Sequence, residues 1–523
     1  MNKEYKLRDS YDVIVTGAGP AGIFTVLELA EKHPEKQILL IEKGSSIENR
    51  NCPKRKTGIC AGCKPCRITT GFAGAGAFSD GKLSLSPDVG GQLDEHIGLD
   101  ETIRLIHKAD RMYLDAGADP HIHGAVQTEE IRKIRTKAIQ SNLKLIDCPV
   151  RHMGTEVGRD IYARFEERIR ALPNIQMVFN TPVRDLIVEN GRAGGIITDK
   201  ARIRADKVVL AVGREGSEWL AELCSRHQID TTIGKVDIGI RVETRNEIMQ
   251  EINDNLYEGK FIYYTRTFDD KVRTFCQNPG GEVSVEYYEN GLAVVNGHSY
   301  KAQEKKTDNT NFALLVSKGF TEPFNSPIAY GRQIAQLGNM LTGKKILVQR
   351  YGDFIRGRRT TDKRLYRNNI VPTLRDAVPG DLGLVLPYRI MVDLNEMIQA
   401  MDKIAPGIAS DETLLYGVEV KFYSNKVTVD RNFETSLSGL YTLGDGAGIT
   451  RGLMQASANG LAAAERMYAG KAEDGNNGSD LRKQTGNEVR HPVGGSGGET
   501  ARMPAASSGD KDKKISPDQG DRS

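Results

Sequence analysis

Four of the seven cysteines in this 523-residue chain fall within fifteen consecutive positions, at Cys52, Cys60, Cys63 and Cys66. The residues around them are rich in Gly, Lys and Pro, so packing of the thiols in an apolar core does not explain the grouping. Four thiolates at such spacings suit either a [4Fe–4S] cluster or a structural zinc ion. A cluster would carry electrons, whereas zinc would only pin the loop. We predict a metal site here, and the spacing leaves its kind open.

Two other side chains could take part in proton transfer or nucleophilic chemistry. Cys276 lies in an otherwise polar strand and turn, where a thiolate could act as a nucleophile or an acid. The simpler alternative for this cysteine is a small core residue. His298 is a competing acid or base. Cys276 and His298 are therefore the candidate catalytic residues, and we expect His121 and His123 to lie on a loop surface.

The strongest chemical signal is a group of glycines near the start of the chain. Residues 11–22 read YDVIVTGAGPAG, in which an apolar strand at 13–15 leads into the spacing Gly-x-Gly-x-x-Gly. One glycine permits the tight turn, the second lets the backbone approach a pyrophosphate, and the third lets helix and strand pack closely. The residues that we expect at the pyrophosphate are Gly17, Gly19, Pro20, Ala21 and Gly22.

The elements around these glycines fit a dinucleotide site. A helix is expected from about residue 23 to 33, and its first N–H groups, with the positive end of its dipole, would face the phosphates. A second apolar strand at 37–41 ends in Glu42. This acid follows the last glycine by about 20 residues, the spacing at which a carboxylate accepts hydrogen bonds from the adenosine ribose. Lys43, the next residue, is included in the predicted site.

A second glycine group, near the end of the chain, describes the other end of the same ligand. An apolar strand at 440–443 precedes it, and a helix of small residues at about 453–468 follows it. The carboxylate of Asp445 can accept a hydrogen bond from a ribityl hydroxyl, while the start of that helix faces a flavin. The members of this group are Gly444, Asp445, Gly446, Ala447 and Gly448. Together the two groups predict non-covalently bound FAD.

The order of the predicted elements gives an α/β fold. Helices at 101–116, 127–141 and 159–171 lead to a strand at 175–179, a meander with an Asn-Gly turn, and an apolar strand that ends at Gly213. We predict a discontinuous Rossmann-like FAD-binding domain, an inserted α+β substrate domain and a disordered C-terminal tail. The expected ranges are 8–220, which includes a Cys-rich loop at 52–86, then 221–430 for the insertion, 431–470 for the return segment and 471–523 for the tail.

Composition argues against several classes of partner. The formal net charge is only +3, so nothing in it indicates nucleic acid. The N-terminus is charged and lacks the apolar core of a secretory signal, and no run approaches the roughly 20 apolar residues of a membrane helix. We expect a cytoplasmic protein that acts on a small molecule without membrane insertion.

Four stretches resemble a known family. They are GAGPAG with Glu42, GFAGAGAFSDGK at 71–82, VVLAVGREG at 208–216 and YTLGDGAGITRGLMQASANG at 441–460. The chain resembles a largely uncharacterised family of FAD-dependent dehydrogenases, within the glutathione-reductase-type and hydroxybenzoate-hydroxylase-type flavoproteins. The resemblance implies that the loop after the second strand runs beside the flavin, so that Ser79, Asp80, Gly81 and Lys82 line the isoalloxazine or its ribityl chain. The family's Cys-x-Cys-Pro-Gly-Gly stretch reads Cys-Gln-Asn-Pro-Gly-Gly at 276–281, so a dithiol there is not supported.

These features predict an FAD-dependent oxidoreductase that transfers a hydride between an organic substrate and flavin N5. No second Gly-x-Gly-x-x-Gly follows a strand, so a dedicated NADPH domain is not expected, and NAD(P)H that docks transiently stays a candidate donor. Among enzymes, the alternatives are a flavin monooxygenase and a prenyl-chain reductase. Outside enzymes, the alternative is a non-catalytic flavin and iron–sulfur module that passes electrons to a redox partner protein.

Overall fold

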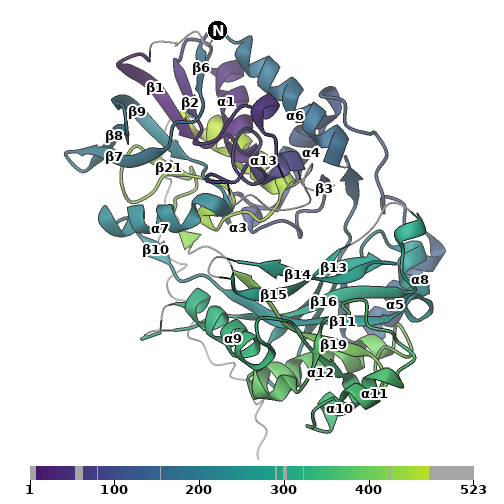
Figure 1. Ribbon diagram of the computed structural model, residues 1–523. Coiled ribbons are helices and arrows are strands. Elements are labelled where there is room, and N and C mark those ends of the chain that lie inside the picture. Colours follow the sequence, from purple (N-terminus) through teal and green to yellow (C-terminus); the bar gives the residue numbers. More distant parts are fainter. Residues whose placement is uncertain are drawn as a thin grey trace, which may run out of the picture. The chain divides into compact units, whose positions relative to one another are not determined.

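The computed structural model describes most of the first 469 residues, and Figure 1 shows how their elements are arranged. The described ranges are 7–53, 63–78, 81–153, 155–288, 291–298, 303–321, 323–324, 326–422 and 426–469. Four features of the sequence prediction lie outside these ranges, namely Cys60, Ser79, Asp80 and the tail at 471–523.

Within the described ranges, the first sheet has seven strands, which come from both ends of the chain. In spatial order, its parallel strands are β6 (Ile175–Val178), β2 (Ile38–Ile41), β1 (Ser10–Thr16), β9 (Arg202–Leu210) and β21 (Leu440–Thr442). The start of β9 also pairs with an antiparallel meander formed by β8 (Arg192–Thr198) and β7 (Val183–Glu189). The last part of the chain therefore re-enters the sheet beside β9.

The parallel strands form because their side chains are apolar on both faces. Residues 13–15 and 38–41 are buried almost completely. Such near-continuous apolar runs are typical of parallel strands that helices cover. The sequence analysis predicted these strands from the same apolar runs, and the structure confirms the predicted α/β class.

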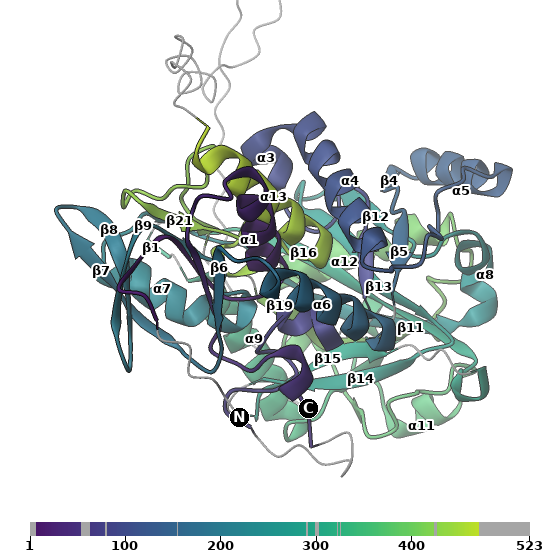
Figure 2. The same cartoon turned by 90° about the horizontal axis from the view of Figure 1, so that it is seen from above.

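Two helices that follow the two glycine groups pack against each other. They are α1 (Pro20–Lys32) and α13 (Leu453–Met467), which lie side by side in Figure 1 and Figure 2. A Cβ atom at Gly460 would lie 2.3 Å from the carbonyl oxygen of Ala21, so glycine permits this close contact. α4 (Leu99–Asp115) packs against α13. The contact brings the beginnings of the two helices, and thus the two glycine groups, to the same edge of the sheet.

The second sheet has eight strands in the part of the chain that the structure describes. In spatial order they are β18 (Val378–Pro379), β17 (Leu347–Arg350), β19 (Leu414–Phe422), β11 (Val236–Arg245), β16 (Asn309–Lys318), β13 (Lys271–Pro279), β12 (Phe261–Tyr264) and β4 (Leu143–Leu145). All neighbours run antiparallel except β17 and β18. β4 lies inside the range that the sequence assigned to the FAD-binding domain, yet it pairs with β12.

The two faces of the second sheet differ in character because side chains alternate along its strands. On β11, Ile240 and Val242 face an apolar core to which α9 (Pro327–Thr342) and α12 (Tyr388–Asp402) contribute. Arg241, between them, points to the other face. That face is covered by a hairpin of β14 (Glu282–Tyr287) and β15 (Ala293–His298), as Figure 1 shows.

The remaining elements connect these layers. The short strand β10 (Thr231–Thr232) pairs with β20 (Lys426–Val427). The segment between these two strands therefore begins and ends at neighbouring points. The other helices and strands are α3 (Leu93–Ile97), α5 (Glu129–Gln140), α6 (Thr155–Arg170), α7 (Ser217–Arg226), α8 (Asn246–Asn255), α10 (Tyr351–Ile355), α11 (Asp362–Tyr366), β3 (Lys82–Ser84) and β5 (Val150–His152). Within the described ranges, no helix is long and apolar enough to cross a membrane.

Candidate functional site

The fold itself requires two of the three glycines in the first group. Gly17 has a φ of +99°, and a Cβ there would lie 2.4 Å from the carbonyl oxygen of Ala211. A Cβ at Gly22 would lie 2.0 Å from the carbonyl oxygen of Gly17. These two positions therefore provide the tight turn and the close packing of helix on strand that the spacing predicts.

Gly19 has no such explanation within the protein. Its φ of −77° and ψ of −178° are open to any residue, and no heavy atom of the described chain lies within 4 Å of a Cβ placed there. Gly19 is the N-cap of α1, and neither its own side chain nor an acidic residue in the first turn occupies the helix start. The open space at this helix N-terminus fits a phosphate group, which the free N–H groups and the helix dipole would attract.

Glu42 is held beside this glycine loop. Its side chain is 7% exposed, and its two carboxylate oxygens accept hydrogen bonds of 2.8 Å from the backbone N–H groups of Ala18 and Gly44. The carboxylate thus lies at the carboxyl end of β2, next to the open side of the loop. Lys43 instead forms a 3.1 Å ion pair with Glu215, and both side chains are partly exposed.

The segment after β2 crosses the glycine loop directly. Ala73 donates a backbone hydrogen bond of 2.6 Å to the carbonyl oxygen of Ala18, and Phe72 donates one of 3.0 Å to Ser45. A Cβ at Gly74 would lie 3.6 Å from the Cα atom of Gly19. The family resemblance implies that this loop also runs beside the flavin, which stays a prediction. Gly81, with a φ of +70°, and Lys82 continue the same segment into β3.

A buried arginine pins this long loop. Arg50 is 1% exposed, and its guanidinium donates to the carbonyl oxygens of Phe72 at 2.5 Å, Ile68 at 2.6 Å and Arg67 at 3.2 Å. It also lies 4.7 Å from the ring centroid of Phe78. Burial lowers the pKa of Arg50 to about 10. The sequence analysis missed this role, because nothing in the sequence distinguishes Arg50 from the other basic residues of this loop.

Three of the four cysteines of the predicted metal site lie in the described part of the chain. Cys52 and Cys63 are partly buried and Cys66 is exposed, and none of the three forms a disulfide. Among the described residues, no three potential metal ligands of the Cys, His, Asp and Glu types come together. Desolvation raises the pKa of the Cys66 thiol, but hydrogen bonds from the backbone N–H groups of Ile68 and Thr69 outweigh it, and the pKa is lowered. The metal site therefore stays a prediction from the sequence.

The second glycine group meets the first at the same edge of the sheet. A Cβ at Gly444 would lie 3.2 Å from the Cβ of Ala21, and one at Gly446 would lie 2.5 Å from the carbonyl oxygen of Gly213. Gly213 and Gly448 both have positive φ, at +63° and +76°. Tight turns at the ends of β9 and β21 thus bring together residues that the sequence analysis placed in one cofactor site.

The carboxylate of Asp445 is fixed at this edge. It accepts a 2.8 Å hydrogen bond from the hydroxyl of Thr450, and its other oxygen lies 3.3 Å from Nε of Arg214. The side chain of Asp445 is 15% exposed, whereas that of Arg214 is 73% exposed. The partly exposed carboxylate of Asp445 therefore lies at the point where the two glycine groups meet.

The two candidate catalytic residues lie in the second sheet and its hairpin. Cys276 has a φ of +49° and occupies an irregular stretch of β13, where the pairing with β16 shifts register. Its sulfur lies 3.7 to 3.8 Å from the side-chain amide of Asn278. His298 is exposed at the end of β15, opposite Glu282. The structure thus places Cys276 in a strained turn of the strand, and the roles of both residues stay predictions.

A buried ion pair that the sequence analysis missed lies beneath the hairpin. Arg241 and Glu419 are both fully buried and form two hydrogen bonds of 2.9 Å. Arg241 also donates to the side chain of Asn311 at 2.9 Å and to the carbonyl oxygen of Cys276 at 3.2 Å. The ion pair joins strands β11 and β19, which are far apart in the sequence. No local sequence pattern therefore predicts this ion pair.

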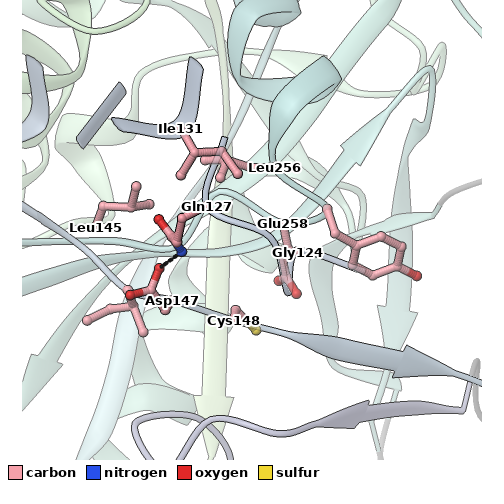
Figure 3. Close-up of a pocket in the computed structure, with 10 residues that line it drawn as sticks. Gly124, Gln127, Ile131, Leu145, Asp147, Cys148, Leu256 and Glu258 are labelled. Carbon is pink, nitrogen blue, oxygen red and sulfur yellow. Dashed lines mark hydrogen bonds between the residues drawn. The ribbon is translucent and has the colours of Figure 1, made fainter. Parts of the chain in front are cut away.

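A small pocket opens beside β4, and Figure 3 shows its lining. Its solvent space is about 20 Å³, enough for roughly one water molecule. Gln127 donates a 3.0 Å hydrogen bond to Asp147 across it, and Cys148, Tyr257 and Glu258 lie along its wall. Burial raises the pKa of the Cys148 thiol. The pocket alone is too small to hold an organic substrate.

These features define a class of protein. A parallel sheet carries two glycine-rich turns at its carboxyl edge, with an acid at the end of β2 and an open helix N-terminus at Gly19. Ligands of open α/β sheets bind at this edge. The first sheet therefore defines a Rossmann-like dinucleotide-binding protein.

Comparison with known proteins specifies the class further. Residues 235–422 match the family described as FAD-dependent protein, C-terminal domain-like, a range that begins just before β11 and ends with β19. An uncharacterized protein of Clostridium beijerinckii is 28% identical over 481 residues, which cover 87% of this chain and 80% of that protein. A glycine oxidase of Pseudomonas aeruginosa is 26% identical over 227 residues, which cover 40% of this chain and 57% of that protein.

Among solved structures, L-proline dehydrogenase from P. horikoshii is similar with a TM-score of 0.36 and 13% identity, over 89% of this chain and 96% of that chain. The family match of residues 235–422 and the dinucleotide-binding geometry of the first sheet agree with each other. Residues 235–422 thus resemble an FAD-dependent family, and the first sheet has the geometry of a dinucleotide-binding fold.

Proposed function

We propose that the chain binds FAD across its two glycine groups and transfers a hydride between a small organic substrate and flavin N5. The observation that best supports this proposal is the empty space next to the Cα atom of Gly19, where a side chain would otherwise lie. Neither its backbone angles nor its neighbours among the described residues call for glycine, whereas a pyrophosphate at this position would. FAD would supply the redox chemistry, and the chain would bind and orient it and exclude water.

Each part of the cofactor has proposed partners on the chain. The N–H groups at the start of α1 would hold the pyrophosphate, Glu42 the adenosine ribose, and Asp445 a ribityl hydroxyl. The full proposed set is Gly17, Gly19, Pro20, Ala21, Gly22, Glu42, Lys43, Ser79, Asp80, Gly81, Lys82, Gly213, Gly444, Asp445, Gly446, Ala447 and Gly448. Cys276 of the second sheet stays the proposed nucleophile or acid, and His298 of the β14–β15 hairpin stays a proposed acid or base.

The local similarity to a glycine oxidase favours a dehydrogenase or oxidase over a monooxygenase. Anaerobic mixing of the FAD-loaded chain with organic acids, amines, alcohols and NAD(P)H tests this proposal. We expect one of these classes to bleach the flavin absorption far faster than it bleaches free FAD in the same buffer. Reduction by a protein donor alone would contradict the proposal and support the electron-transfer module. Iron and zinc analysis of the same sample tests the metal site at Cys52, Cys60, Cys63 and Cys66.

A further inference from the structure

The turn that follows β9 has a closely packed backbone and two exposed charged side chains. It begins at Gly213, which has a φ of +63°, and continues as a single 3-10 turn, Arg214–Gly216. A Cβ atom at Gly216 would lie 2.6 Å from the Cβ of Val212, so the turn folds back on the residues just after β9. Arg214 and Glu215 are both exposed. The turn therefore presents one cation and one anion at the carboxyl edge of the first sheet.

The anion of this turn reaches past β1. The carboxylate of Glu215 lies 3.1 Å from Nζ of Lys43, the residue after Glu42 at the end of β2. β2 and β9 are the two neighbours of β1, and adjacent strands lie about 4.8 Å apart. The Lys43–Glu215 ion pair therefore spans the carboxyl end of β1, where the first glycine group begins.

The cation of the turn is tied on the opposite side. β21 pairs with β9 on the side away from β1, and Nε of Arg214 lies 3.3 Å from the carboxylate of Asp445 just after β21. The backbones also touch, since a Cβ at Gly446 would lie 2.5 Å from the carbonyl oxygen of Gly213. The turn thus connects the segment proposed to hold the adenosine ribose with the segment proposed to hold the ribityl chain.

The ion pair across β1 is half exposed. The side chains of Lys43 and Glu215 are 37% and 43% exposed, and within the described ranges neither has another oppositely charged group within 4.0 Å. An ion pair in such a position adds little to the stability of a fold, and salt screens it. Loss of either side chain would leave the other in contact with solvent, so the chain should fold without this pair.

We propose that the Lys43–Glu215 ion pair is a clasp that retains FAD, with the cofactor between the pair and the first glycine group. The inference rests on the proposed function, because a clasp needs a dinucleotide at this edge of the sheet. FAD that extends from Glu42 to Asp445 would cross the same edge as the ion pair, and the pair would open before the cofactor leaves. Lys43, which the sequence analysis included in the cofactor site, thus acts on FAD through Glu215 and not by direct contact.

The rate at which the FAD-loaded full-length chain releases its cofactor tests the proposal. The chain is diluted into a large volume of buffer at about 20 mM or about 500 mM NaCl, and the rise in FAD fluorescence gives the rate. At low salt, we expect Glu215→Gln and Lys43→Met each to release FAD about three- to fivefold faster than the native chain. The double variant should be no faster than either single variant, since all three lack the same ion pair. At high salt, the native chain and Glu215→Gln should release FAD at similar rates.

Glu218→Gln is the matched control. Glu218 lies three residues beyond Glu215, and its 2.9 Å ion pair with Arg332 is likewise exposed, but this pair joins α7 to α9 and does not reach β2. Its loss should leave the release rate unchanged. The melting temperature of each variant shows that it is folded.

Equal release rates of the native chain and Glu215→Gln at low salt would refute the clasp. An equally fast release from Glu218→Gln, or a difference that persists undiminished at high salt, would also refute it. Effects of the two single variants that multiply in the double variant would show that Lys43 contacts the cofactor directly, which contradicts the proposal. A native chain that takes up no FAD would refute both the clasp and the proposed function, whereas a native chain that holds FAD as loosely as its variants would refute the clasp alone.

Discussion

Two glycine-to-alanine substitutions, three residues apart, should have opposite effects. In Gly19→Ala the new methyl group meets no heavy atom of the described chain within 4 Å, and the φ of −77° suits alanine. The apoprotein should therefore be as stable as the native chain. In Gly22→Ala the methyl group would lie 2.0 Å from the carbonyl oxygen of Gly17, so either the turn or α1 must shift.

The magnitudes follow from what each methyl group displaces. At Gly19 it would occupy the space of the pyrophosphate and remove at least one charge-assisted hydrogen bond, which contributes about 1.5–3 kcal/mol. This corresponds to about a 10- to 150-fold rise in the Kd for FAD. At Gly22 the overpacking should cost about 3 kcal/mol, the upper part of the usual range, because the neighbour is backbone and cannot move aside.

The assay measures binding and stability separately. Quenching of FAD fluorescence on titration with apoprotein gives the Kd, and thermal unfolding followed by circular dichroism without FAD gives the melting temperature. We expect Gly19→Ala to change only the Kd, and Gly22→Ala to lower the melting temperature by about 3 °C. If Gly19→Ala is folded and binds FAD as tightly as the native chain, Gly19 does not face the pyrophosphate and the reasoning fails.

Three further predictions concern buried polar groups. Burial, together with the neighbouring carboxylate of Asp270, raises the pKa of Asp393 to about 7. Above pH 5 the folded chain therefore keeps a proton on Asp393 that the unfolded chain releases. The free energy of unfolding should fall by about 2 kcal/mol between pH 5 and pH 7. Asp393→Asn should flatten this part of a urea-unfolding profile, and an equal slope in both proteins would contradict the assignment. Arg50→Met leaves three loop carbonyl oxygens without the guanidinium that donates hydrogen bonds to them. It should lower the free energy of unfolding, measured by urea titration, by about 2–4 kcal/mol. A change below about 0.5 kcal/mol would show that solvent satisfies these carbonyl oxygens. Arg241→Met removes both guanidinium hydrogen bonds from the buried carboxylate of Glu419 and leaves Lys421, at 3.3 Å, as its remaining cation. The change should lower the free energy of unfolding by about 3 kcal/mol, and the double variant with Glu419→Met should recover part of that loss. Additive losses in this double-mutant cycle would rule out the pairing as the cause.

The sequence predicted those parts of the molecule whose physics is local. The apolar strands at 13–15 and 38–41 could be predicted because both of their faces are buried. Gly17 and Gly22 could be predicted because a tight turn and a helix contact tolerate no side chain. The elements around the second glycine group followed from the same reasoning, and β21 and α13 lie where the strand and helix were expected.

The rest depends on contacts between distant segments. β4 has only three residues, and it becomes a strand because β12 offers it an edge. Arg50 became the anchor of the cysteine loop, a role that the sequence analysis had given to a metal as one interpretation. His123 and Tyr257 stack although 134 positions separate them. No periodicity or local spacing in the sequence predicts such contacts, because they form only when both sheets have formed.

The most direct test of the central claim is the flavin content of the purified full-length chain after incubation with FAD and removal of the unbound cofactor. The account predicts flavin absorption bands that correspond to about one FAD per chain. Absence of those bands from a folded chain would contradict it, since the open side of Gly19 and the position of Glu42 would then have no ligand to explain them.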